Sequence, residues 1–340
     1  MKKIFVLHSS ITEKIAISII NKRQLEDFIF ITTARYRTER GGHNLNQIFR
    51  LDAIGVNLLS TWAGIFRGDR RVSEISGGPF HLYVPNTALE KIRLLLSHRQ
   101  CEGFSVMEEG LYSYCSRAQL EEMLPLGRES LRERFTHFGR LGDQRFCRDG
   151  YSNLFALTSD AFPGRAGKNI LSVEFSESQG SVFPGQDIRE DHCILICESL
   201  SYLHREKTSV YVASFVEVLQ IASTRYEKIH YKLHPDSYGT WQETLLRNLI
   251  HRHASAAEEI DRSASIEDIA IGSSADVLVN ISSAGLYCGL YSEGDVYSFH
   301  DIFSSNGRGV GIYEEEGRGA HDWVPDIFWD NVTCLKNGRR

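Results

Sequence analysis

The sequence predicts an α/β protein built from two doubly wound domains. Short apolar runs typical of buried strands alternate with longer segments of helical periodicity along most of the chain. With 340 residues, 42% of them hydrophobic and 24% charged, the chain has the length of two domains and the composition of a globular protein. Its charge is divided, because residues 1–150 carry a net charge of +5 and residues 151–340 a net charge of −11. We therefore predict two domains, 1–170 and 171–340, with different partners.

The first half is predicted to begin as strand, helix and strand. Ile4–Leu7 is a short apolar run, Ile11–Ile20 has isoleucines at helical spacing, and Phe28–Thr32 is a second buried strand. A crossover of this length joins parallel strands. Further along we expect a strand at Phe104–Met107 and helices at Ala88–Leu96, Ala118–Leu124 and Glu129–Phe138. The segment 155–190, rich in Gly, Ser and Phe, is interpreted as the connection between domains.

The second half repeats the same alternation. Strands are predicted at Cys193–Cys197, Ile229–Leu233, Val277–Ile281 and Val296–Phe299. Helices are predicted at Val210–Arg225, at Trp241–His251 and from Ser283 onward. Cys193 and Cys197 fall on one face of their strand and are interpreted as core residues. The sequence thus predicts a second parallel sheet in this half.

Several classes of function are disfavoured by what the sequence lacks. No stretch approaches the roughly 18 apolar residues of a membrane span, and the odd set of seven cysteines, without Cys-x-x-Cys spacing, fits a reduced cytoplasmic compartment. The net charge of −6 and the lack of a basic stripe disfavour nucleic-acid binding. Neither a Gly-x-Gly-x-x-Gly fingerprint after the first strand, nor a Walker A sequence, nor an Asp-x-Asp pair is present.

Three short motifs each follow a predicted strand, where doubly wound sheets bind their ligands. They are Glu108-Glu109-Gly110, His234-Pro235 and Ser282-Ser283. A second acidic-acidic-Gly triplet, Glu315-Glu316-Gly317, falls in a Gly-rich loop instead. Each motif also has an ordinary structural interpretation: a solvated turn, a strand closed by proline, and a serine helix cap. The position of all three motifs at strand ends favours chemistry.

In their order and spacing, these motifs resemble those of bacterial sialyltransferases of the two-domain GT-B type. The resemblance covers most of the chain as architecture and rests on few residues; it is greatest to the enzymes of capsule and lipooligosaccharide synthesis, polysialyltransferases included. It implies two Rossmann-like doubly wound domains facing each other across a cleft. Domain 1–170 is then expected to hold the acceptor and the catalytic base, and domain 171–340 the donor, CMP-sialic acid.

The resemblance also implies roles for individual residues. Glu108 is expected to be the general base, supported by Glu109 and Gly110, and His234 to donate a proton or hydrogen bond to the leaving phosphate. Donor binding is expected from a further set: Lys232, Pro235, Glu267, Ser282 and Ser283. For the nucleotide contact, Asp268 is an equal neighbour of Glu267. A single displacement implies inversion at the anomeric carbon, and a monophosphate leaving group needs neither a metal ion nor a further cofactor.

Alternative functions stay open at this stage. Another GT-B enzyme that uses a UDP or CMP sugar, such as a Kdo transferase, would share the fold without needing Glu108. A non-catalytic α/β binding protein would use the three motifs as turns and caps. The acceptor is expected to be an oligosaccharide or glycolipid, but its identity and the linkage formed are not readable. Peripheral association with the inner membrane is also left open by the sequence.

Overall fold

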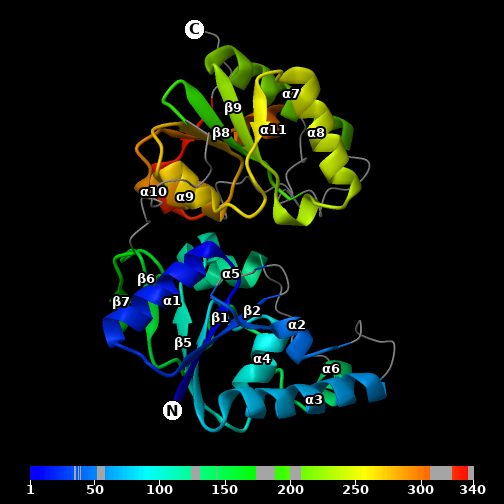
Figure 1. Cartoon of the computed structure of the whole chain (residues 1–340), viewed down its shortest axis with the longest axis vertical. Coiled ribbons are helices and arrows are strands. Elements are labelled where there is room, and N and C mark those ends of the chain that lie inside the picture. The colour runs from blue at the N-terminus through cyan, green and yellow to red at the C-terminus, as the bar shows by residue number, and fades with distance from the viewer. Residues whose placement is uncertain are drawn as a thin grey trace. The chain divides into compact units, whose positions relative to one another are not determined.

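Two parallel β-sheets, one in each half of the chain, organise the protein (Figure 1). The computed structural model describes residues 1–33, 36, 38, 40–51, 58–123, 131–142, 144–173, 188–199, 208–306 and 324–335. It divides into unit 1, Met1–Glu174, and unit 2, Phe175–Arg340. The sequence analysis set its domain boundary at 170/171. The triplet Glu315-Glu316-Gly317 lies outside the described residues.

Unit 1 contains strands and helices in alternation. Its strands are β1 (Lys2–Leu7), β2 (Phe28–Thr32), β3 (His43–Asn44), β4 (Phe80–Val84), β5 (Cys101–Met107), β6 (Leu154–Ala156) and β7 (Lys168–Ile170). Its helices are α1 (Ser10–Arg23), α2 (Leu45–Ile48), α3 (Leu58–Ser76), α4 (Glu90–Leu96), α5 (Arg117–Met123), α6 (Leu131–Thr136) and the 3-10 turn η1 (Leu111–Tyr114). The strands pair in the order β3-β2-β1-β4-β5-β6-β7, all in parallel.

Unit 2 has the same plan. Its strands are β8 (His192–Ile196), β9 (Lys228–Lys232), β10 (Ala257–Glu259), β11 (Asp276–Val279), β12 (Val296–Ser298) and β13 (Thr333–Cys334). Its helices are α7 (Thr208–Arg225), α8 (Trp241–His253), α9 (Ile266–Ile271), α10 (Ser283–Tyr291), α11 (His300–Asn306), α13 (Asp326–Asn331) and the 3-10 turn η3 (Pro235–Ser237). The order β10-β9-β8-β11-β12-β13 is also wholly parallel.

Both sheets therefore have the Rossmann strand order, in which the third, second and first strands precede the fourth, fifth and sixth. In this topology the chain reverses its direction of winding between the first and the fourth strand. The reversal lies between β1 and β4 in unit 1 and between β8 and β11 in unit 2. The predicted α/β class with two Rossmann-like doubly wound domains is confirmed.

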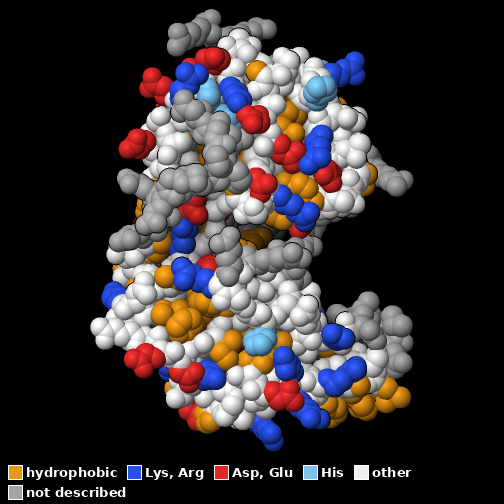
Figure 2. Space-filling model, in the orientation of Figure 1, with side chains coloured by type: hydrophobic (Ala, Val, Ile, Leu, Met, Phe, Trp, Pro, Cys, Tyr) orange, Lys and Arg blue, Asp and Glu red, His pale blue; other side chains and the backbone are white. Residues whose placement is uncertain are grey.

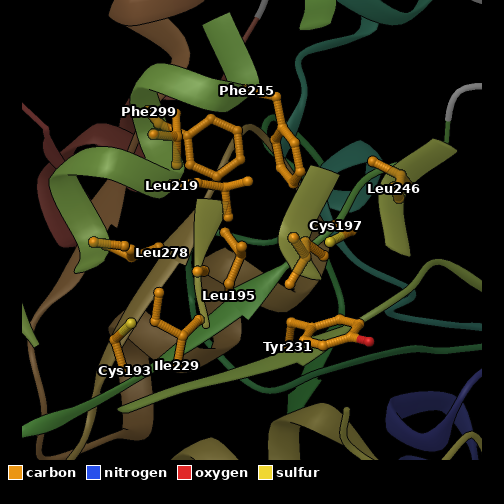
Figure 3. Close-up of a cluster of buried hydrophobic side chains, with 14 of the residues drawn as sticks. Cys193, Leu195, Cys197, Phe215, Leu219, Ile229, Tyr231, Leu246, Leu278 and Phe299 are labelled. Atoms are coloured by element: carbon orange, nitrogen blue, oxygen red, sulfur yellow. The ribbon is translucent and has the colours of Figure 1, made fainter. Parts of the chain in front are cut away.

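The core of unit 2 shows how alternating strand residues fill both faces of one sheet. Leu195 of β8 and Leu278 of β11 face α7, where they pack with Phe215 and Leu219 (Figure 3). Cys193 and Cys197, both within this cluster, are core residues as the sequence predicted (Figure 3). On the opposite face, Val279 lies so close to α10 that a Cβ at Gly285 would come within 2.8 Å of its side chain.

The division between the units falls within the segment 155–190, where the sequence analysis placed the connection. The sequence analysis missed β6 and β7, which add two strands to the sheet of unit 1 in the first part of this segment. The sequence analysis also missed α3 and β4. Glycines at 64 and 68 weaken the helical pattern of α3, yet they are required there because Arg50 and Phe49 pack directly on that helix. Among the described residues, no helix combines the length and apolar character of a transmembrane span.

Candidate functional site

Polar side chains gather where the strands of unit 1 end. His8 follows β1, Asn86 lies two residues beyond β4, and Glu108 and Glu109 follow β5. These three strands are neighbours, and the topological reversal lies between the first two. Open α/β sheets bind ligands at this place, outside the carboxyl ends of the strands.

Glu108 is directed into the interior of unit 1. Its Oε1 accepts a hydrogen bond of 2.6 Å from the Tyr114 hydroxyl, and its Oε2 accepts one of 2.7 Å from the Leu157 backbone N–H. The residue has no exposed surface. A buried carboxylate of this kind ties η1 and the segment after β6 to the end of β5, because leaving these donors unpaired would be unfavourable.

Gly110 explains why the motif ends in glycine. Its φ of +129° lies in the region that side-chain-bearing residues rarely adopt. This conformation turns the chain from β5 into η1, so that Tyr114 returns to Glu108. Within the same turn, the Ser113 hydroxyl accepts a hydrogen bond of 3.0 Å from the Glu109 backbone N–H. The acidic-acidic-Gly motif is thus a tight turn that gives its two carboxylates different partners: Tyr114 and Leu157 for Glu108, and Asn86 and His8 for Glu109.

Glu109 lies at the carboxyl ends of the central strands, beside residues that follow β1 and β4. Its Oε2 accepts a 2.9 Å hydrogen bond from the Asn86 side-chain amide and lies 3.4 Å from Nε2 of His8. The other carboxylate oxygen, Oε1, accepts no hydrogen bond from the described part of the chain. Burial raises the pKa of Glu109, while the positive charge of His8 and the Asn86 hydrogen bond lower it. The Glu109 carboxylate is therefore held through Oε2, while Oε1 accepts no hydrogen bond from the described residues.

The His-Pro motif in unit 2 also forms a turn in which a hydrogen bond fixes a side chain. Nδ1 of His234 accepts a 3.1 Å hydrogen bond from the Asp236 backbone N–H. Pro235 has no N–H and occupies the first position of η3, so Asp236 supplies the donor that the imidazole caps. His234 itself has the extended conformation that a following proline favours, and its side chain is 41% exposed. With Nδ1 accepting, the proton of the neutral ring lies on Nε2.

Lys232 and Glu267 lie near each other in unit 2. The Lys232 ammonium donates hydrogen bonds of 2.8 and 3.2 Å to the backbone carbonyls of Asp261 and Arg262. Burial lowers the pKa of Lys232, and the negative charges of Asp261 and Glu267 oppose this effect. Glu267 lies in the first turn of α9, where its Oε2 accepts a 3.1 Å hydrogen bond from Ser265. Lys232 thus holds the loop after β10 beside the start of α9.

The serine pair stands at the start of helix α10, separated from the end of β11 by Asn280 and Ile281. Ser282 is the N-cap residue, and its Oγ accepts a 3.0 Å hydrogen bond from the Gly285 backbone N–H. Ser283 is the first residue of the helix. The structural use of Ser282 as a cap is therefore observed. Its hydroxyl proton is still available as a donor, because a capping serine uses only an oxygen lone pair.

A hydrogen-bonded network that the sequence analysis missed lies at the topological reversal of unit 2. Glu198, after β8, accepts a 2.8 Å hydrogen bond from Asn280, after β11. Oδ1 of Asn280 in turn lies 3.3 Å from Nδ1 of His300, whose Nε2 contacts the Ser304 hydroxyl at 2.9 Å. Burial raises the pKa of Glu198 to about 7. This carboxyl group is therefore partly protonated near neutral pH.

Comparisons with known proteins agree with this architecture. No protein-family model matches the sequence, and no curated protein matches it. Among solved structures, the UDP-GlcNAc 2-epimerase of Methanocaldococcus jannaschii, in complex with UDP-GlcNAc and UDP, is similar at 13% identity. That similarity covers 88% of this chain and 84% of the other, with a TM-score of 0.52. The chain has the GT-B fold.

Two further GT-B neighbours are more distant. A UDP-N-acetylglucosamine 2-epimerase assigned in Listeria monocytogenes is 13% identical over 91% of this chain and 82% of its own, with a TM-score of 0.48. A UDP-forming trehalose-phosphate synthase from Burkholderia vietnamiensis is 10% identical over 97% and 91%, with a TM-score of 0.45.

Within this GT-B fold, the structure places all the sequence-predicted site residues at carboxyl ends of strands or in the helices that follow them. In unit 1 it separates Glu108 from Glu109, and it joins Glu109 to His8 and Asn86, which the sequence analysis did not select. In unit 2 it adds Glu198, Asn280 and His300. The available signal was a polar residue directly after an apolar strand, as at Leu7-His8, Cys197-Glu198 and Val279-Asn280.

Proposed function

We propose that this GT-B protein is an inverting sialyltransferase, which moves a sialic acid from CMP-sialic acid to a hydroxyl of a glycan acceptor. The observation that carries the proposal is the position of the three motifs. Each lies just beyond the end of a parallel strand of a Rossmann-like sheet: Glu108 directly after β5, His234 two residues beyond β9 and Ser282 three residues beyond β11. Unit 2 would then bind the donor, and unit 1 the acceptor.

The residues of unit 2 are suited to a nucleotide monophosphate. Nε2–H of His234 and the hydroxyl of Ser282 are donors at the ends of β9 and β11, and the start of α10 adds the positive end of a helix dipole. Glu198 has its pKa raised to about 7, so the local negative charge is smaller than the composition of this half indicates. These groups can stabilise a phosphate as the glycosidic bond breaks.

A second candidate donor is a UDP sugar or CMP-Kdo. The UDP sugar is favoured by the Methanocaldococcus jannaschii neighbour, which was solved with UDP-GlcNAc and UDP. The strand-end chemistry would be shared, since each donor releases a nucleotide phosphate. The two proposals differ in the donor that the protein accepts, and direct competition between donors separates them.

The reaction is tested by nucleotide release from the purified chain. We expect CMP release from CMP-N-acetylneuraminic acid that depends on pooled galactosides or sialylated oligosaccharides and continues in EDTA. Parallel reactions with CMP-Kdo and UDP-GlcNAc show which donor is used. Release of UDP alone would replace the donor with a UDP sugar. No release from any donor, together with no CMP binding by calorimetry, would contradict catalysis and favour a binding protein.

Unit 1 also carries an exposed apolar patch that is suited to a membrane surface. It joins α3 to α6 and the residues after α6 through aromatic contacts. The centroid of the Trp62 ring lies 5.6 Å from that of Phe135 and 5.2 Å from that of Phe138. Figure 2 shows hydrophobic side chains together with Lys and Arg in this region. The exposed apolar members are Leu59, Phe66, Leu131, Phe135 and Phe138. The same helices expose the arginines Arg67, Arg70, Arg71 and Arg134.

We propose that this patch rests on an anionic bilayer, because exposed aromatic residues beside arginines match the interface of such a membrane. The protein is expected to float with vesicles containing phosphatidylglycerol, and less so at high salt. The variant Phe66→Ser/Phe135→Ser should reduce the bound fraction at least about fivefold. Burial of each ring in the bilayer interface contributes on the order of 1 kcal/mol or more to the free energy of binding. Leu89→Ser, an exposed residue outside the patch, is the matched control. Equal flotation of both variants would contradict the assignment.

A further inference from the structure

The two adjacent carboxylates of unit 1 differ in what their oxygens contact. Both oxygens of Glu108 accept short hydrogen bonds from Tyr114 and Leu157 within the interior. Glu109 uses only Oε2, which Asn86 and His8 hold, and its side chain is 7% exposed. A general base must have an oxygen that the reacting hydroxyl can reach. Only Glu109 meets this condition.

We propose that Glu109, oriented by His8 and Asn86, takes the proton of the acceptor hydroxyl, and that Glu108 maintains the turn that presents it. This inference rests on the proposed sugar transfer. The acceptor oxygen forms a bond to the anomeric carbon as the bond from that carbon to the CMP phosphate breaks. The hydroxyl proton passes to Oε1 of Glu109, and the electron pair of the broken bond leaves with the phosphate.

His8 is well fixed for this positioning role. Its backbone N–H donates a 3.1 Å hydrogen bond to the Thr12 hydroxyl, within the capping box that begins α1. Its Nδ1 is enclosed and has no hydrogen-bond partner in the described ranges, so the ring presents Nε2 to Glu109. His8 and Asn86 come from the two strands on either side of the topological reversal. The acceptor hydroxyl is therefore expected at the place where an open α/β sheet binds its ligand.

The surroundings of Glu109 define a dependence on pH. The Glu109 carboxylate contacts His8, which follows β1, and the uncharged Asn86, which lies beyond β4. The Ser113 hydroxyl of η1 accepts a hydrogen bond from the Glu109 backbone N–H. Burial raises the pKa of Glu109, and the charge of His8 lowers it. A base works only when deprotonated, so activity falls as the pH drops through this pKa. Removal of His8 removes the lowering effect, which moves the acidic limb of kcat/KM to higher pH.

The test compares Glu109→Gln with its neighbour Glu108→Gln in the full chain, at saturating CMP-N-acetylneuraminic acid. Glu109→Gln should lower acceptor-dependent kcat by about 10²- to 10⁴-fold, the range of general base catalysis, with the Kd for CMP within twofold of wild type. Glu108→Gln should lower the melting temperature and reduce kcat by less than about tenfold. His8→Gln should shift the acidic limb upward and lower kcat less than Glu109→Gln does.

Tyr114→Phe separates the two carboxylates if Glu108→Gln does not fold, because it removes one contact of Glu108 and leaves both acids in place. We expect it to retain activity within about threefold. A larger loss in Glu108→Gln than in Glu109→Gln, at equal melting temperature, would overturn the assignment of the base. A wild-type protein that transfers no sugar from any donor would overturn the proposed function, and the assignment with it.

Discussion

Replacement of His234 by alanine is expected to lower acceptor-dependent kcat by at least about 100-fold while the fold is retained. The imidazole is 41% exposed at the end of β9 and contributes little to the core. Because Nδ1 accepts the Asp236 N–H, the ring can offer Nε2–H to a phosphate without carrying a charge. Of the two roles expected from the sequence, proton donor or hydrogen-bond donor, this geometry favours the second.

The variant His234→Gln and the pH profile distinguish these roles. A glutamine amide can place an N–H near the position of Nε2, so a hydrogen-bond donor should be rescued to within about tenfold of wild type. The rate should also persist from pH 7 to pH 9, because a neutral imidazole needs no extra proton. A steep decline above pH 7, with His234→Gln as inactive as His234→Ala, would show that the imidazolium donates its proton instead.

The second large effect is expected at Gly294, where two loops of unit 2 come into close contact. A Cβ at this position would lie 2.1 Å from the backbone carbonyl oxygen of Ala275. The next residue, Asp295, pairs with the start of β11 through a 2.8 Å hydrogen bond from the Val277 N–H. Gly294→Ala must therefore separate β11 from β12, and we expect it to destabilise unit 2 by about 3 kcal/mol or more.

Thermal and urea unfolding monitored in unit 2 measure this effect. Gly239→Ala is the control, because Gly239 has a φ of +74° and open space around its Cβ position. It should lose only about 1–2 kcal/mol, the ordinary penalty of that backbone conformation. Loss of stability in Gly294→Ala no greater than in this control would show that the loops can move apart freely. Since Ser282 follows β11, CMP binding should weaken together with stability.

Local patterns predicted those elements whose own residues decide their structure. β2 was predicted at its observed bounds, Phe28–Thr32, because five consecutive β-forming residues between polar segments have no helical alternative. Helix α7 was predicted at 210–225 and observed at Thr208–Arg225, because its length supports a clear periodicity. In contrast, β6 and β7 have three residues each, and only the pairing of β6 with β5 and of β7 with β6 makes them strands.

The sequence by itself determined that two α/β halves exist and that three polar motifs stand at strand ends, because strand length and polarity are local properties. Tertiary structure alone decided which carboxylate of Glu108-Glu109 keeps an oxygen without a hydrogen bond from the described residues. Gly110 bends the chain, Tyr114 and Leu157 enclose the first acid, and His8 and Asn86 hold the second. These partners lie between 6 and 101 residues from the acids they contact. Parallel pairing of distant strands brings most of them together, and no local pattern encodes that pairing.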